Sequence, residues 1–156
     1  MLGQNHHHHH CISTLGKIPD ADFSFRRSSR RQNMDDYDAI KDTIGHYFEG
    51  VRTKDRTRLE RAFTVDIAHI KGYAKNQSGD LELWSLPIKD MIDVWVSDDA
   101  PPPNRDYGKI LSIQIYSDIA ATALFDCSGV YLDTFHMIKF NGEWRITDKF
   151  YVDYQA

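Results

Sequence analysis

Apolar residues in the first half of the chain recur at the spacing of three and four residues that a helix requires. Between residues 35 and 53 they form one stripe, made of Ile40, Ile44, Tyr47, Phe48 and Val51. A short helix is predicted over 55–63, where Asp55 is a suitable N-cap. A third helix is predicted over 86–96, with Ser85 placed to cap it.

The second half alternates between apolar and polar positions, as strands with one buried face do. Short strands are predicted at 68–73 and 81–84. Four longer strands follow, at 107–116, 119–128, 130–140 and 143–154. The pairs Ser117-Asp118 and Asn141-Gly142 are typical of two-residue hairpin turns. Helices gathered ahead of such strands indicate an α+β fold, in which a strongly curved antiparallel sheet wraps around the N-terminal helices and encloses a pocket.

Alternation also assigns faces to two of these strands. One face of the strand at 119–128 carries Ile119, Ala121, Ala123, Phe125 and Cys127. One face of the last strand carries Trp144, Ile146, Phe150 and Val152. Asp148 falls on that otherwise apolar face, where a carboxylate has to be hydrogen-bonded or paired.

Residues 1–33 lack these patterns. They include His6 to His10, a run typical of an affinity tag, so we expect a tag or disordered leader followed by one domain at 34–156. A natural metal-binding histidine tract or a basic targeting arm is the alternative for this segment.

The charge of the chain changes once the leader is set aside. The whole chain has a net charge of −4, but the leader holds five basic and two acidic residues, which leaves 14 basic against 21 acidic side chains. An acidic domain argues against a nucleic-acid partner, which would need clustered Lys and Arg. No apolar run is long enough to span a membrane, and no secretory segment is visible. Cys127 is the one cysteine after the leader, which excludes a disulfide within the domain and favours a reducing, cytoplasmic compartment.

Two stretches resemble a known family. Residues 44–55, IGHYFEGVRTKD, resemble an opening helix with the pattern YF-x-G-x-x-x-x-D. Residues 135–149, FHMIKFNGEWRITDK, resemble the ending FH-x-x-K-x-x-G-x-W-x-I-x-N-K of the subgroup described as "putative lumazine-binding" in the nuclear transport factor 2-like superfamily. The resemblance covers residues 35–154.

This resemblance implies a cone-shaped, cystatin-like α+β barrel with a pocket, and often a homodimer. The same fold serves ketosteroid isomerases, scytalone dehydratase, SnoaL-like polyketide cyclases and binding proteins without catalysis. Because the fold does not choose among them, function has to be argued from the site.

Three residues are candidate catalytic groups. Tyr47 resembles the oxyanion-hole tyrosine of the isomerases in its position, and is otherwise a core tyrosine. His136 lands where the isomerases carry a protonated carboxyl, and is a candidate acid, base or ligand donor, or else an ordinary core or surface histidine. Asp148, where the family pattern usually has Asn, is expected to orient His136 or hold a ligand, or to bond a nearby backbone group or Tyr47.

Other positions extend or limit that chemistry. Lys71 falls near the general-base carboxylate of the isomerases, and a cation cannot abstract a carbon-bound proton in that way. His69 is either structural or a base paired with His136, as two histidines serve in scytalone dehydratase. Further ligand contacts are expected from Trp84, Trp95, Phe125 and Thr134. The histidines of the domain lack the spacing of metal ligands, so we expect no metal and no cofactor.

We therefore expect a protein that binds an aromatic or heterocyclic small molecule. One alternative is a lyase or isomerase of the dehydratase or polyketide cyclase kind, using His136, Tyr47 and Asp148. The second alternative is a dimeric protein-association module.

Overall fold

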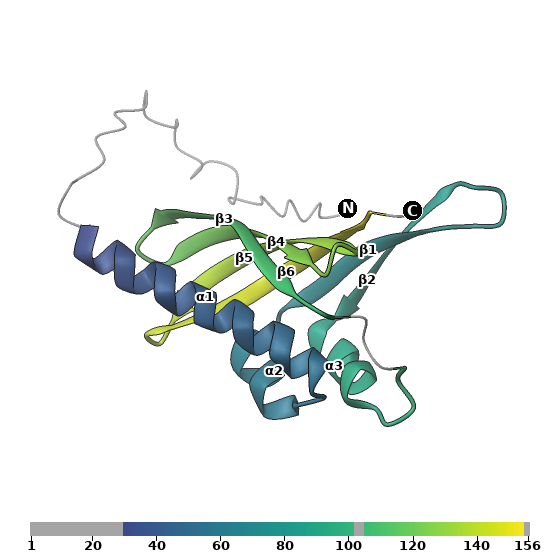
Figure 1. The fold of residues 1–156 in the computed structure, drawn as a ribbon, viewed down its shortest axis with the longest axis horizontal. Helices are drawn as coiled ribbons and strands as arrows, with labels where there is room; N and C mark the ends of the chain where they lie inside the picture. The colour runs from purple at the N-terminus through teal and green to yellow at the C-terminus, as the bar shows by residue number, and fades with distance from the viewer. Residues whose placement is uncertain (1–29, 102–104, 155–156) are drawn as a thin grey trace, which may run out of the picture.

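A computed structural model of the chain describes residues 30–101 and 105–154, with side chains from residue 35 onward (Figure 1). The helices are α1 (Arg30–Arg52), α2 (Arg56–Ala62) and α3 (Ile88–Val96). The strands are β1 (His69–Lys75), β2 (Leu81–Pro87), β3 (Gly108–Ser117), β4 (Ala120–Cys127), β5 (Tyr131–Phe140) and β6 (Glu143–Asp153). They form one curved sheet in the order β2-β1-β6-β5-β4-β3, which confirms the α+β class although the sheet does not close on itself.

Helix α1 runs along the concave side of the sheet, and α2 and α3 lie near its last turns (Figure 1). Helix α1 begins at Arg30, inside the segment predicted to be a leader. Its predicted apolar stripe is the buried face, because Ile40, Ile44, Tyr47 and Val51 all belong to the core. Two hydrogen bonds link α1 to Trp144 of β6. The carbonyl of Trp144 accepts a hydrogen bond from the hydroxyl of Thr43 at 2.8 Å, and its indole nitrogen donates to Asp36 at 3.0 Å.

Local signals in the sequence set several boundaries. The Asp55 carboxylate accepts a hydrogen bond from the backbone nitrogen of Arg58 at 3.2 Å and caps α2, as predicted. Asn141 and Gly142 have φ angles of 50° and 78°, as a two-residue hairpin turn requires. Helix α3 starts later than predicted, because residues 85–87 pair with β1 and extend β2. Ser85 therefore does not cap that helix.

The sheet differs from the predicted antiparallel one at a single junction. Strand β1 lies parallel to β6, with His69 opposite Asp148 and Lys71 opposite Phe150. The chain reaches this position directly from α2, where Phe63 already bridges to Ile146 in the parallel sense. The six-stranded sheet is therefore mixed.

A β-bulge in β6 changes which residues face the helices. Ile146 pairs with Met137 and Asp148 pairs with His136, so that Thr147 is an extra residue between them. Trp144 and Ile146 point inward before the bulge, whereas Lys149 points inward after it. Asp148 and Phe150 consequently lie on the outer face, which corrects the predicted face of Trp144, Ile146, Phe150 and Val152.

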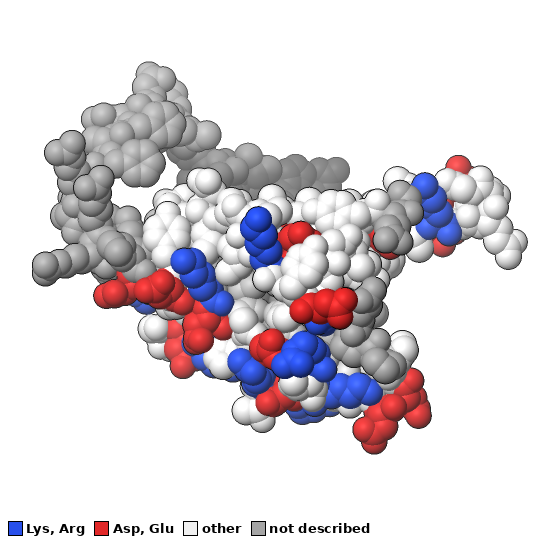
Figure 2. All heavy atoms as spheres, viewed as in Figure 1, with Lys and Arg blue, Asp and Glu red and all other residues white. Residues whose placement is uncertain are grey.

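The surface bears both signs of charge. Acidic and basic side chains intermingle over the helices on the face that Figure 2 shows, and the sheet region above them is largely uncharged. The row predicted for β4 is buried except for Ile119, which lies before the strand and is exposed. Among the described residues, no helix has the length and apolar character that crossing a membrane requires.

Candidate functional site

A small pocket lies where the concave face of the sheet meets α1 and α3. Its volume is about 170 Å³. Its walls are mainly aromatic and apolar side chains, with cationic groups at two points: Tyr47, Ile70, Trp84, Met91, Trp95, Arg105, Tyr131, Lys149 and Tyr151. This combination of apolar walls and a few convergent polar groups is typical of a ligand site.

The polar groups of the pocket form one connected network. Lys149 Nζ lies 2.9 Å from Asp133 Oδ1, and the hydroxyl of Tyr47 donates to Asp133 Oδ2 at 3.1 Å. The guanidinium of Arg105 donates to the Tyr47 oxygen at 3.2 Å and contacts the sulfur of Cys127 at 3.4 Å. The side chains of Lys149 and Asp133 are only 4% and 1% exposed. Every buried side-chain nitrogen and oxygen in the described part of the chain has a hydrogen-bond partner.

Aromatic rings hold Tyr47 in place. Its ring centroid lies 5.5 Å from that of Phe135 and 5.8 Å from that of Trp95, in edge-on or tilted geometries. Two cations lie close to its ring as well: the Cζ atom of Arg105 is 5.2 Å and Lys149 Nζ is 5.4 Å from the centroid. The Tyr47 hydroxyl is therefore presented from a fixed position.

Burial changes the titration of two pocket groups. It raises the pKa of Tyr47 well above the ordinary value, although the nearby Arg105 cation opposes this. Burial lowers the pKa of Lys149, against the opposing charge and hydrogen bond of Asp133. At neutral pH the Tyr47 hydroxyl is thus a proton donor in hydrogen bonds. The network holds two basic side chains, Arg105 and Lys149, against one carboxylate, Asp133, which suits a ligand oxygen rich in electrons.

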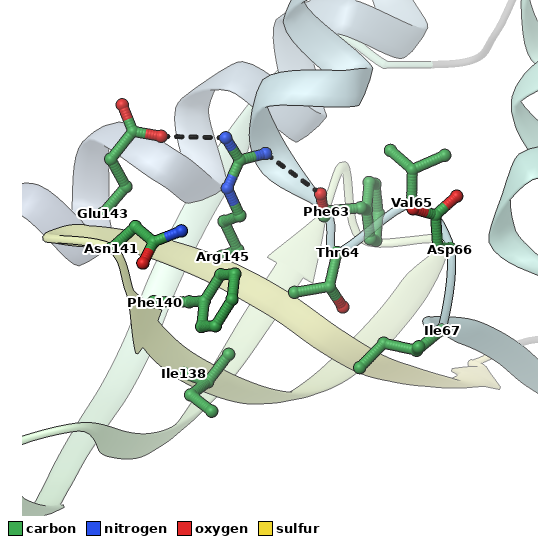
Figure 3. A pocket seen from close by; sticks show the side chains of 10 residues that line it. All are labelled: Phe63, Thr64, Val65, Asp66, Ile67, Ile138, Phe140, Asn141, Glu143 and Arg145. Carbon is green, nitrogen blue, oxygen red and sulfur yellow. Dashed lines mark hydrogen bonds and ion pairs between the residues drawn. The ribbon is translucent and has the colours of Figure 1, made fainter.

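A larger hollow of about 560 Å³ lies between the α2–β1 connection and the β5–β6 hairpin (Figure 3). Its walls include exposed apolar side chains, since Ile67 is 66% and Phe140 is 57% exposed. Its cation is already engaged: Arg145 pairs with Glu143 at 2.8 Å and donates to the carbonyl of Phe63 at 3.2 Å. None of the residues that line this hollow has a buried charged side chain, so it offers a ligand fewer desolvated charged groups than the small pocket does.

Only some of the predicted site residues lie at the pocket. Tyr47, Trp84 and Trp95 line the pocket. Phe125 lies behind it in the core, with its ring centroid 6.4 Å from that of Tyr47. His69 is half-buried near the start of β1, and its Nδ1 lies 3.1 Å from the carbonyl oxygen of Ile67.

His136 and Asp148 lie on the opposite, outer face of the sheet. His136 Nδ1 is 3.7 Å from Asp148 Oδ2, and Lys71 Nζ is 3.3 Å from Asp148 Oδ1. The His136 side chain is 64% exposed. Thr134 shares this face and donates to the carbonyl of Phe150 at 3.3 Å. The structure thus brings Asp148 to His136, as one reading of the sequence expected, but separates both from Tyr47.

Sequence reasoning missed Asp133, Lys149, Arg105 and Tyr151. Asp133 could have been found, because it shares the parity of the buried Phe135 and Met137 in β5. Lys149 was hidden by the bulge before it. In the part of the chain that the structure describes, no three His, Cys, Asp or Glu residues gather as metal ligands do.

Comparison with known proteins agrees with this geometry. The sequence profile of the family described as "Putative lumazine-binding" matches residues 35–152. An NTF2-like protein of unknown function from Shewanella baltica OS155 is 28% identical, with a TM-score of 0.63, over 79% of this chain and 97% of its own. A second such protein, from Methylobacillus flagellatus KT, is 26% identical, with a TM-score of 0.60, over 75% and 90%. No curated protein matches the chain.

The fold also extends to an enzyme of low identity. Hexachlorocyclohexane dehydrochlorinase LinA-type3 from Novosphingobium barchaimii LL02 is 16% identical, with a TM-score of 0.57, over 78% of this chain and 88% of its own. At this identity the likeness concerns the fold alone.

Proposed function

Given that the chain belongs to the nuclear transport factor 2-like family described as "Putative lumazine-binding", we propose that it binds a small planar aromatic or heterocyclic ligand in the pocket beneath α1. The observation that carries the proposal is the buried network of Tyr47, Asp133, Lys149 and Arg105 under aromatic walls. A buried ion pair adds little net stability compared with apolar packing. Its presence in a pocket therefore supports a role in ligand binding.

The size of the pocket limits the ligand. A closed cavity of roughly 150 Å³ holds one benzene ring, and this pocket measures about 170 Å³ and opens to solvent. One ring or two fused rings therefore fit, stacked against Trp84, Trp95 or Tyr151.

The charges of the pocket set the orientation of that ligand. Lys149 and Arg105 are both donors that line the pocket, and the network has two basic groups against one carboxylate. A carbonyl, enolate or phenolate oxygen would point toward these donors, with the rings toward the aromatic walls. Pterin- and lumazine-like heterocycles and aromatic ketones share this chemistry.

The test is a ligand titration followed by the fluorescence of Trp84 and Trp95, with calorimetry to confirm the stoichiometry. Tyr47→Phe removes the hydroxyl that links Asp133 to Arg105, so the polar groups of the pocket lose their fixed positions and binding should weaken about tenfold. His136→Ala is the matched control on the outer face and should leave affinity unchanged. The proposal fails if no heterocycle or ketone of this panel binds the folded protein, or if His136→Ala weakens binding as much as Tyr47→Phe.

A lyase or isomerase is the second candidate, favoured by the cationic side chains of Lys149 and Arg105 in the pocket lining. Two such donors would stabilise an oxyanion that forms in a proton-transfer reaction. Turnover of a bound ketone that is lost in Tyr47→Phe, with binding retained in part, would support catalysis. Binding without turnover would support the first candidate.

We also propose that the outer face of the sheet pairs two copies of the chain, as the family resemblance implies. Leu83 and Phe140 are exposed apolar side chains of strands that would support such contact. Light scattering should give twice the monomer mass, and Phe140→Lys should shift the protein toward the monomer. A monomeric wild type would contradict this arrangement and leave the pocket proposal intact.

A further inference from the structure

We propose that Lys149 is a carbonyl-capturing amine, whose Nζ condenses reversibly with an aldehyde or ketone group of a ligand in the pocket to form a protonated imine. The inference rests on the proposed function, because such a ligand has to enter the same pocket. It goes further in that it names the reactive class, aldehydes and ketones, and the atom that bonds to them.

The position of Lys149 is unusual for a lysine. Lysine side chains are almost never fully buried, and among the lysines in the described part of the chain Lys149 alone is buried. The bulge at Thr147 turns it toward the pocket, which it lines. Its Nζ lies 5.4 Å from the ring centroids of both Tyr47 and Tyr151, so it sits between two aromatic walls.

The surroundings of the amine favour its neutral, nucleophilic form. A lysine becomes a nucleophile when it is desolvated or lies near another cation. Burial lowers the pKa of Lys149, and the charge of Arg105 lowers it further. Asp133 opposes this shift, but its carboxylate at 2.9 Å is also the base positioned to accept the proton that the ammonium has to lose.

The reaction balances without an oxidant or a reductant. The Lys149 ammonium gives one proton to Asp133, and the neutral amine attacks the carbonyl carbon. A C–N bond forms while the π electrons move to oxygen, and a proton passes from nitrogen to that oxygen to give a carbinolamine. Asp133 returns its proton to the hydroxyl, water leaves, and the nitrogen lone pair forms the C=N bond. The protonated imine then faces the Asp133 carboxylate, as the ammonium did.

Tyr47 is placed to assist the change at oxygen. Its hydroxyl bonds to Oδ2 of the same carboxylate whose Oδ1 meets Lys149. Arg105 donates to the Tyr47 oxygen and so stabilises negative charge there. Once Asp133 has taken the proton of Lys149, the Tyr47 hydroxyl can donate to the developing alkoxide instead, which is what carbinolamine formation needs.

Reductive trapping tests the inference. The full chain is incubated with 4-hydroxybenzaldehyde and sodium cyanoborohydride, which reduces protonated imines in preference to aldehydes, and is then digested and mapped by mass spectrometry. We expect one hydroxybenzyl group on Lys149. Because burial lowers its pKa, a larger fraction of Lys149 is neutral than of the exposed Lys41 and Lys89, so Lys149 should be trapped faster and in higher yield than either.

Two variants complete the experiment. Lys149→Arg keeps the positive charge beside Asp133 and cannot form an imine, so trapping should fall to the level of the exposed lysines. Lys41→Arg removes an exposed lysine and should leave trapping at Lys149 unchanged.

Binding of the aldehyde is followed separately by tryptophan fluorescence. If it binds but Lys149 is trapped no faster than Lys41, the inference is overturned and the proposed function stands. If the aldehyde and the wider ligand panel all fail to bind the folded protein and no trapping at Lys149 occurs, both fail.

Discussion

Asp133 of β5 and Lys149 of β6 meet diagonally across two neighbouring strands, with 2.9 Å between Oδ1 and Nζ and with only 1% and 4% of their side chains exposed. Each charge compensates the other at a place where water does not solvate them well. Removal of one partner leaves the other charge buried and unpaired.

The pair should therefore respond differently to single and double substitution. Asp133→Leu and Lys149→Met should each lower the free energy of unfolding by about 3–5 kcal/mol. The double variant Asp133→Leu with Lys149→Met should recover much of that loss, because neither charge of the pair is then left without the other. Urea unfolding of the four proteins measures the coupling, and additive losses would contradict it.

Titration of Tyr47 should make the protein less stable at alkaline pH. Burial raises the pKa of Tyr47 in the folded state well above its ordinary value of 10.0. Above that pH the unfolded chain loses the phenolic proton while the folded chain keeps it, so this contribution to stability is complete below pH 10 and declines above it. The slope is at most about 1.4 kcal/mol per pH unit for one proton.

Buried Lys149 changes the free energy of unfolding in the opposite direction as the pH rises, because its pKa is lowered in the folded state. The pH dependence of the wild type alone therefore does not isolate the contribution of Tyr47. Urea unfolding at a series of pH values should show a shallower alkaline decline in Tyr47→Phe than in the wild type, since Lys149 is common to both. Equal slopes would mean that Tyr47 titrates normally.

Gly72 has no side chain, and the ring of Tyr151, which lines the pocket, occupies the space beside it. A Cβ atom at Gly72 would collide with the ring of Tyr151 and come within 2.8 Å of its hydroxyl oxygen. Gly72→Ala should destabilise the fold by about 1–3 kcal/mol, as overpacking does, and should weaken ligand binding by displacing Tyr151. Gly45→Ala in α1, where no atom lies within 4 Å, is the control and should stabilise by about 0.5–1 kcal/mol.

The outer cluster of His136, Asp148 and Lys71 should contribute little to stability. Its groups are partly or largely exposed, and ion pairs of this kind contribute about 1 kcal/mol or less. His136→Ala and Lys71→Ala should unfold within about 0.5–1 kcal/mol of the wild type. A larger loss in either variant, measured by urea unfolding, would give this face a structural role that its exposure does not suggest.

What could be predicted from the sequence was what depends on near neighbours. The α1 stripe, the Asp55 cap and the Asn141-Gly142 turn each follow from a few consecutive residues, and all three appear in the structure. The helical period alone also placed Tyr47 on the buried face of α1, where the structure has it.

What could not be predicted depends on distant pairing. The parallel contact of β1 with β6 has no local signature, since either direction would satisfy the alternation of β1. The bulge at Thr147 is visible only against the register of β5, and it reverses the faces of Asp148 and Lys149. Arg105 lies just after Pro101, Pro102 and Pro103, where the sequence has no periodic pattern that would assign its side chain to the pocket.

That one extra residue has a consequence for how such pockets diversify. Before Thr147 the inner face of β6 is apolar, and after it the same face presents an amine. Insertion or deletion of a single residue in this strand exchanges an entire set of side chains between pocket and surface. Proteins of this fold can therefore acquire or lose a charged pocket through a change in strand length, without any substitution at the positions that carry the charge.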